Sequence, residues 1–136
     1  MLKIKGFTFP EVIITIAIVG ILSMAAVPVY RGYVRKSIST EGKSLLAEIN
    51  AAEQIYYARN GGFYATESNG AGDDKLILGV NAEKNQYFTS YVVKDIKKDG
   101  DDFVFTATTE YKGKAITLRG SLTKEPVIID DFSTED

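Results

Sequence analysis

The hydrophobic pattern begins with an uninterrupted apolar stretch close to the N-terminus. Residues 12–29, VIITIAIVGILSMAAVPV, carry no charge, and the wider stretch 7–30 carries one, that of Glu11. A helix of this length rises about 36 Å, enough to cross the roughly 30 Å hydrocarbon core of a bilayer. A buried core helix is the alternative, but the rest of the chain is too short to surround one. The pattern therefore predicts a transmembrane helix over residues 7–30.

A one-sided apolar pattern continues over residues 31–60. Apolar positions recur three, four or seven residues apart, as on one face of a helix. They are Tyr30, Val34, Ile38, Leu45, Ile49, Ala52 and Tyr56. Asn60 followed by Gly61 and Gly62 is typical of a helix end. We expect an amphipathic helix with one face packed on a soluble domain.

The remaining pattern predicts a loop followed by a sheet. Residues 61–86 are rich in Gly, Asn, Asp and Ser, which is typical of a loop. Residues 87–131 contain alternating runs separated by Asp99-Gly100-Asp101 and by Lys112-Gly113. The runs cover residues 87–95, 103–111, 116–124 and 127–131. They predict three or four antiparallel strands with one apolar face, packed on the long helix in an α+β fold.

Composition excludes most enzyme chemistry. The 136 residues include no cysteine and no histidine, so a disulfide, a cysteine nucleophile and a Ser-His-Asp arrangement are all excluded. The 16 basic and 18 acidic residues give a net charge of −2, and no specific nucleic acid partner is expected from it. We expect a non-enzymatic protein without a cofactor.

The first six residues, MLKIKG, form a short basic leader. A secretory signal peptide is the alternative, since Ser23, Ala25 and Ala26 could supply its cleavage site. Against it, the apolar run exceeds the usual length and the helical pattern continues past Pro28. Basic residues flank the run on both sides and leave its orientation open. They are Lys3, Lys5, Arg31, Arg35 and Lys36.

The segment Gly6-Phe7-Thr8-Phe9-Pro10-Glu11, followed by the apolar run, resembles the N-terminus of type IV pilins and type II secretion pseudopilins. In that family a prepilin peptidase cuts after a glycine and methylates the new N-terminal residue, usually Phe. The resemblance implies cleavage of leader 1–6 after Gly6, methylation of Phe7 and an assembly role for Glu11. Pro10, where an aliphatic residue is usual, and the missing cysteine pair are departures from the family pattern.

The resemblance also implies a function and a location. We expect a type IV pilus subunit, acting in adhesion, motility or DNA uptake, with globular domain 31–136 outside the membrane. The implied partners are further copies in a helical filament, the prepilin peptidase, an inner-membrane assembly platform and the membrane itself before assembly. The precursor would cross the inner membrane once, and the product would be an extracellular pilus or a periplasmic pseudopilus. A major pseudopilin of type II secretion and a membrane-anchored binding module are the alternatives.

Three residues in the stretch 7–30 have predicted roles in assembly. A carboxylate at the bilayer centre costs about 2.5–3.5 kcal/mol, so Glu11 is expected to pair with the α-amino group of Phe7 in a neighbouring subunit. Alternatively, Glu11 stays at the membrane edge and complements the helix dipole. Gly20 and Pro28 weaken a helix and are expected to let it extend in a filament, although both are also common in membrane helices.

Two acidic clusters near the C-terminus are weak candidates for calcium. They contain Asp99, Asp101, Asp102, Asp130 and Asp131. Neither has the spacing of an EF-hand loop, and solvated turn charges explain both. No metal site is therefore predicted.

Overall fold

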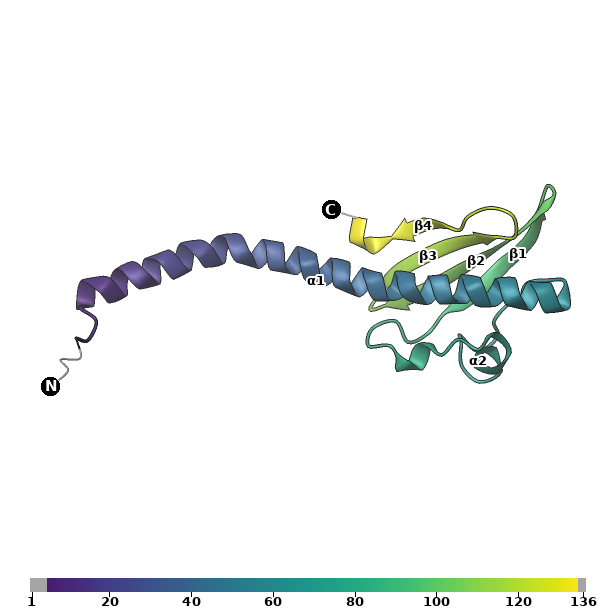
Figure 1. Cartoon of the computed structure of the whole chain (residues 1–136), viewed down its shortest axis with the longest axis horizontal. Helices are drawn as coiled ribbons and strands as arrows, with labels where there is room; N and C mark the ends of the chain where they lie inside the picture. The colour runs from purple at the N-terminus through teal and green to yellow at the C-terminus, as the bar shows by residue number, and fades with distance from the viewer. Residues whose placement is uncertain (1–4, 135–136) are drawn as a thin grey trace. The chain divides into compact units, whose positions relative to one another are not determined.

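Helix α1 (Phe9–Asn60) is the first element of the computed structural model, which describes residues 5–134. It is followed by the short helix α2 and a four-stranded sheet (Figure 1). The later elements are α2 (Asp73–Leu78), η1 (Ala82–Lys84), β1 (Val92–Asp99), β2 (Asp102–Tyr111), β3 (Lys114–Ser121), β4 (Val127–Asp131) and η2 (Phe132–Thr134). These elements make an α+β fold, as the sequence predicted.

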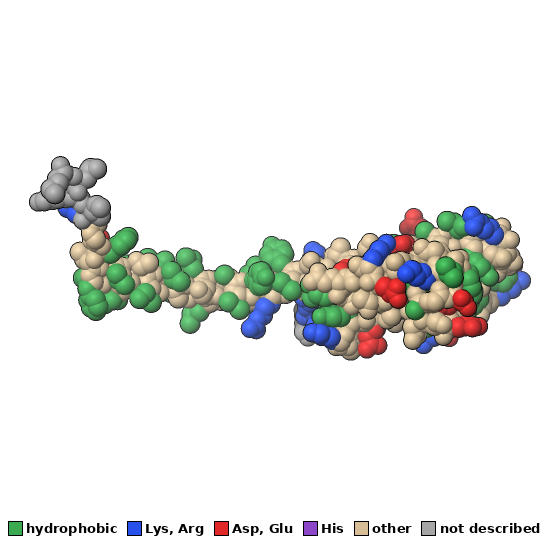
Figure 2. Space-filling view, turned by 90° about the horizontal axis from the view of Figure 1, so that it is seen from below, with side chains coloured by type: hydrophobic (Ala, Val, Ile, Leu, Met, Phe, Trp, Pro, Cys, Tyr) green, Lys and Arg blue, Asp and Glu red, His purple; other side chains and the backbone are tan. Residues whose placement is uncertain are grey.

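The chain divides into two compact units between Arg35 and Lys36. In the first unit, residues 9–34 of α1 are exposed, and Figure 2 shows hydrophobic side chains along this segment. By length and composition this part of α1 can cross a membrane. An apolar helix surface of this extent requires lipid or other helices around it.

The second unit contains the C-terminal part of α1 and the sheet. All strand pairs are antiparallel, in the order β1-β2-β3-β4. Lys112 and Gly113 join β2 to β3 with φ values of 49° and 75°, the left-handed geometry of a two-residue hairpin turn. Both outer strands carry a register shift, between Lys94 and Lys97 in β1 and opposite Thr117 and Leu118 in β4. The strand order makes β1 and β4 the two edges of the sheet, and the register shifts make both edge strands locally irregular.

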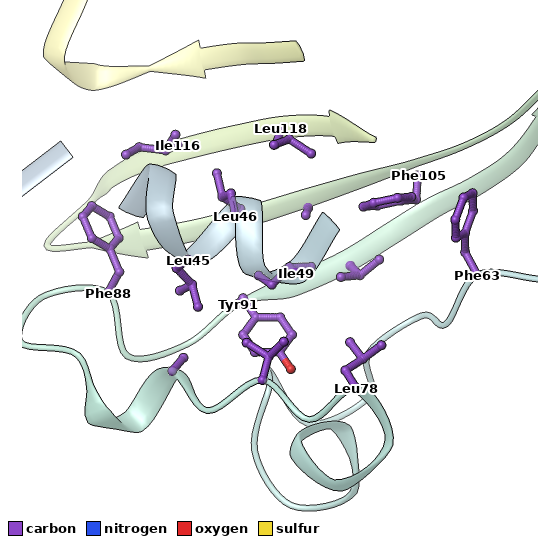
Figure 3. Packing of buried hydrophobic residues seen from close by; sticks show 14 of the residues in the cluster. Leu45, Leu46, Ile49, Phe63, Leu78, Phe88, Tyr91, Phe105, Ile116 and Leu118 are labelled. Atoms are coloured by element: carbon purple, nitrogen blue, oxygen red, sulfur yellow. The ribbon is translucent and has the colours of Figure 1, made fainter. Parts of the chain in front are cut away.

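The core lies between α1 and the inner face of the sheet. Figure 3 shows Leu46 of α1 pointing towards Ile116 and Leu118 of β3, with Phe105 of β2 alongside. Leu46 and Ile49 are 0% exposed, and burial of each side chain contributes about 1.5–3 kcal/mol. The amphipathic half of α1 is thus held by its contacts with the sheet.

Gly42 lets α1 approach the sheet closely. A Cβ atom at this position would lie 2.7 Å from Ile116 Cδ1 and 3.0 Å from Phe88 Cε2. Both distances are shorter than ordinary carbon contacts, so a larger residue would push the helix away or displace the ring.

The helical stripe is confirmed in its C-terminal part. Leu45 and Ile49 are buried, whereas Tyr30 and Val34 are exposed. Three further members pack on the core while partly exposed: Ile38, Ala52 and Tyr56. The helix ends at Asn60, as predicted from the two glycines that follow it, Gly61 and Gly62.

The segment expected to be a loop, residues 61–86, contains helix α2. Asp73 and Asp74 in its first turn complement the helix dipole, and Gly79 closes it with φ 74° and an N–H bond to the Lys75 carbonyl. The first strand begins at Val92, later than the expected residue 87. Residues 86–88 are instead bound through their backbone to the Glu41 carboxylate of α1.

Candidate assembly site

Thr8 and Glu11 form a hydrogen-bonded cap at the start of α1. The backbone N–H and the hydroxyl of Thr8 each donate to Glu11 Oε2, both at 2.7 Å. The Val12 N–H donates to the Thr8 carbonyl at 3.2 Å. The bond from the Thr8 N–H to Glu11 is one half of a capping box, in which Ser or Thr precedes Glu or Gln by three residues; the Thr8 hydroxyl donates to the same carboxylate instead of accepting from the helix backbone. The helix start is therefore fixed by Glu11 itself.

The Thr8–Glu11 contact is not among the sequence predictions above, although the spacing Thr-x-x-Glu is a signal for it. In the uncut chain the Phe7 nitrogen is an amide bonded to Gly6, so no amino group is present there to pair with Glu11. Glu11 then binds Thr8 of its own chain. Leader removal would supply the cation that the predicted inter-subunit pair requires.

The expected cleavage site lies just before α1. Gly6 and Phe7 precede the helix, and the Phe7 side chain is 86% exposed. A Cβ atom added to Gly6 would have no neighbour within 4 Å among the described residues. The Gly6–Phe7 bond is thus in an open, non-helical segment that an enzyme can approach.

Gly20 and Pro28 both lie within the continuous helix α1. Two hydroxyl groups of the same segment bond back to the helix: Thr15 Oγ1 donates to the Glu11 carbonyl and Ser23 Oγ to the Val19 carbonyl, each at 2.7 Å. Pro28 removes one backbone donor from the segment. The structure thus shows a continuous helix at both residues, and the extension of this segment in a filament stays a prediction.

The acidic candidates at the β1–β2 end of the sheet bind groups of the protein. Asp99 Oδ2 accepts from Arg119 Nη2 at 2.6 Å. Asp102 accepts from the Ser121 hydroxyl and from the backbone of Phe103 and Thr123. The Ser121 bond, with these backbone donors, keeps the pKa of Asp102 below its usual value. Among residues 5–134, no three acidic side chains are placed to share a metal ion.

Asp131 ties the end of β4 to α1. Its carboxylate is 2.5 Å from Lys43 Nζ and accepts from Ser39 Oγ at 3.0 Å and the Ser133 N–H at 2.9 Å. Burial acts to raise the pKa of Asp131, but the bonds from Lys43, Ser133 and Ser39 outweigh it and hold the pKa at about 2. Asp131 is therefore an ionised structural anchor.

Asp74 anchors the segment between α1 and the sheet. Its buried carboxylate accepts the backbone N–H groups of Glu67, Ser68 and Gly70 and the hydroxyl of Tyr64. Burial raises the pKa of Asp74, but these four donors together lower it. The four hydrogen bonds to Asp74 therefore hold residues 64–70 in place, although this segment contains no helix or strand.

Glu53 is a buried carboxyl group on α1. Its Oε2 accepts the Tyr64 N–H at 2.8 Å, while its Oε1 and the Tyr91 hydroxyl have no hydrogen-bond partner among the described residues. Burial raises the pKa of Glu53 to about 7, although the Tyr64 bond opposes the shift. This helix residue was not singled out from the sequence.

Comparison with known families identifies the class of the chain. Residues 28–117 match the family model described as type IV minor pilin ComP, DNA uptake sequence receptor. Residues 1–27 match the prokaryotic N-terminal methylation motif. The long helix, the sheet and these matches agree, and the chain belongs to the type IV pilin family. It is a structural pilus subunit and not an enzyme.

Individual relatives are fimbrial subunits. The chain is 34% identical over 116 residues to the fimbrial protein EcpC of Eikenella corrodens, covering 85% of this chain and 69% of the relative. It is 33% identical over 121 residues to the type IV major pilin protein PilE of Neisseria gonorrhoeae, covering 84% and 65%. FimA of Dichelobacter nodosus, a type IV major fimbrial protein, is 33% identical over 90 residues, covering 63% and 56%. The chain thus spans about two thirds or less of these relatives. No solved structure matches it.

Proposed function

We propose that the chain is made as a membrane-anchored precursor, cut after Gly6, and built into a filament through its N-terminal helix. The observation that carries the proposal is Glu11, a carboxylate at the start of an exposed apolar helix in a member of the pilin family. In a polymer, the apolar segment is buried against the helices of neighbouring subunits instead of lipid. The family match and the fimbrial relatives favour a pilus over a secretion pseudopilus.

Cleavage changes the chemistry at Glu11. A peptidase cut at Gly6–Phe7 creates a positive amino group at Phe7, four residues before the carboxylate. Within one chain the Thr8 donors already hold Glu11 Oε2. A neighbouring subunit brings a cation whose attraction to Glu11 strengthens in the low dielectric of packed helices. An incoming subunit that leaves this carboxylate buried and unpaired would be rejected, because a buried unpaired charge costs several kcal/mol.

The proposal places the protein in the inner membrane as a single-pass precursor, with the prepilin peptidase and an assembly platform as partners. Loss of Lys3 and Lys5 with the leader leaves 14 basic against 18 acidic residues and a net charge of −4 on the mature chain. The cytoplasmic side for the leader follows from the family resemblance, because basic residues flank the apolar run on both sides.

Electron microscopy of fibres sheared from producing cells tests this function. Filaments that contain this chain, shown by peptide identification, are expected. A matched deletion strain should lack these peptides, and a chain found solely in the membrane fraction would contradict the proposal.

Reception of DNA is a second candidate, favoured by the description of the matched family model. Edge strand β1 exposes Lys94, Lys97 and Lys98, which could contact phosphates. Asp95 and Asp99 alternate with them, so the strand is not strongly basic. Binding carried by phosphate contacts falls steeply with salt.

A duplex-binding titration at several salt concentrations tests this candidate. Substitution of Lys97 and Lys98 by Gln should weaken binding and reduce the salt slope by about 0.9 for each lost contact. Lys112→Gln, at the exposed β2–β3 turn, is the matched control. Unchanged affinity in the double variant would remove β1 as the DNA surface.

A further inference from the structure

Two apolar patches remain exposed on the second unit, although its core is complete. The first patch is formed by Ile55 of α1 and by Leu76 and Ile77 of α2, which are 54%, 80% and 44% exposed. The second patch follows the edge strand β4, where Val127, Ile128 and Ile129 are 57%, 36% and 57% exposed; Ile128, opposite Leu118, lies on the inner face of the sheet, and Val127 and Ile129 lie on the outer face. Groups of exposed aliphatic side chains mark contact surfaces.

The first patch borders a groove between α1 and α2. Ile55 and Ile77 line it from opposite sides, with Tyr56 and Val80, and its volume is about 370 Å³. Arg59 stands at the end of α1 in the same lining. This arginine forms no ion pair with any other residue of the described range 5–134.

The second patch lies on the outer edge of the sheet. β4 pairs with β3 on one side, and its other side has no strand beside it among the described residues. Asp130 directly follows the patch, is exposed and makes no ion pair within residues 5–134. An edge strand with three successive exposed aliphatic residues is a site where another chain can pack.

The two patches are complementary in charge and lie on different sides of the unit. Figure 1 shows α2 and β4 on opposite sides of the C-terminal part of α1. The groove patch is bordered by the cation Arg59 and the edge patch by the anion Asp130, neither of which has an ion-pair partner in the part of the chain that the structure describes. A contact between two different surfaces is heterologous, or head-to-tail, and it builds an open helical filament when the rotation between copies does not close a ring.

We propose that the β4 edge of one copy, residues 127–129, packs against the α1–α2 groove of the next copy, with Asp130 facing Arg59. This inference rests on the proposed function, because it supplies the contact between globular domains of neighbouring filament subunits. Contact between two groove patches or two β4 edges would bring like charges together and is disfavoured by the same residues.

Disulfide cross-linking in assembled filaments tests the contact, since the chain has no cysteine of its own. The variant carrying both Ile77→Cys and Ile128→Cys should form a ladder of dimers, trimers and larger species on mild oxidation. Each single variant should remain monomeric on a denaturing gel. The matched control combines Ile77→Cys with Lys112→Cys at the exposed β2–β3 turn and should also give no ladder.

The outcomes separate the contact from the function. Filaments of the double variant without cross-links would overturn the contact and leave the proposed function standing. Dimers from Ile128→Cys alone would show β4 edges meeting each other, and dimers from Ile77→Cys alone would show groove meeting groove; either result would overturn the head-to-tail pairing. Absence of filaments from the unsubstituted chain would contradict the proposed function and the contact together.

Discussion

Lys43 Nζ of α1 lies 2.5 Å from Asp131 Oδ2 at the end of β4, and the Asp131 side chain is 7% exposed. Ser39, one helical turn before Lys43, donates to the same carboxylate. Two residues of one helix thus hold the edge strand that the proposed subunit contact uses. The pair is partly shielded from water, so salt screens it less than a fully exposed ion pair.

Asp131→Asn should destabilise the chain and remove part of its acid sensitivity. The pKa of Asp131 is lowered from 3.8 to about 2, so its ionised form contributes about 2 kcal/mol above pH 4. Because the folded pKa is the lower one, this stability is lost as the pH falls from about 4 to 2. Denaturant unfolding of the full chain in detergent, from pH 2 to 7, measures the effect. Asp130→Asn is the control and should change unfolding by less than about 0.5 kcal/mol.

Glu53→Gln should stabilise the chain at neutral pH. Burial raises the pKa of Glu53 from 4.5 to about 7, so the folded state favours the neutral carboxyl group. The wild-type chain should therefore lose stability as the pH rises from 4.5 to 7, by up to about 3 kcal/mol. Glutamine keeps an acceptor for the Tyr64 N–H and cannot ionise. The same unfolding series should show a flatter pH profile, while Glu67→Gln, at an exposed position, should follow the wild type. An unchanged profile in Glu53→Gln would contradict the assignment.

Gly42→Ala should destabilise the second unit by about 1–3 kcal/mol, the usual cost of overpacking. The new methyl group would meet the Ile116 and Phe88 side chains. Gly32→Ala is a matched control in the same helix, because it has no neighbour within 4 Å and alanine favours the helix. Thermal unfolding of both variants checks the prediction. Equal melting temperatures would show that the helix–sheet approach is not tight at Gly42.

Glu11→Gln should separate capping from assembly. Glutamine can still accept the Thr8 bonds of a capping box, so the helix start and membrane insertion should be retained. It carries no charge for the Phe7 amino group, and surface filaments should fall to background in fibre yields. Thr8→Val should lower helix stability by about 1 kcal/mol and still allow filaments. Wild-type yields from Glu11→Gln would refute the charge-pairing role.

The sequence predicted the long helix, its end at Asn60 and an antiparallel sheet of three or four strands, because these follow from local periodicity and turn residues; the structure has four strands. It missed helix α2, whose six residues are too few to show a helical period. The sequence also assigned the stripe position Tyr30 to a packed face, whereas the structure exposes it. Burial of the Tyr30 side chain requires a partner surface, and the spacing of apolar residues along the helix does not show whether one is present.

The part of the candidate site that lies in one short sequence motif could be predicted from the sequence. Gly6, Phe7 and Glu11 stand in one short motif. The bonds of Asp131 to Lys43 and of Glu53 to Tyr64 join residues from separate elements, and no pattern along the chain links them. Asp102 and Asp131 are weak calcium candidates in the sequence, because acidic residues cluster there, and no metal site is predicted from them. In the fold their oxygens accept from protein donors.

Mass spectrometry of the N-terminal peptide from fibres sheared off the cell surface tests the central claim most directly. Our account predicts that the filament subunit begins at Phe7 and that its amino group is methylated, so that Glu11 can pair with it. A filament subunit that begins at Met1, with leader residues 1–6 still attached, would contradict the account.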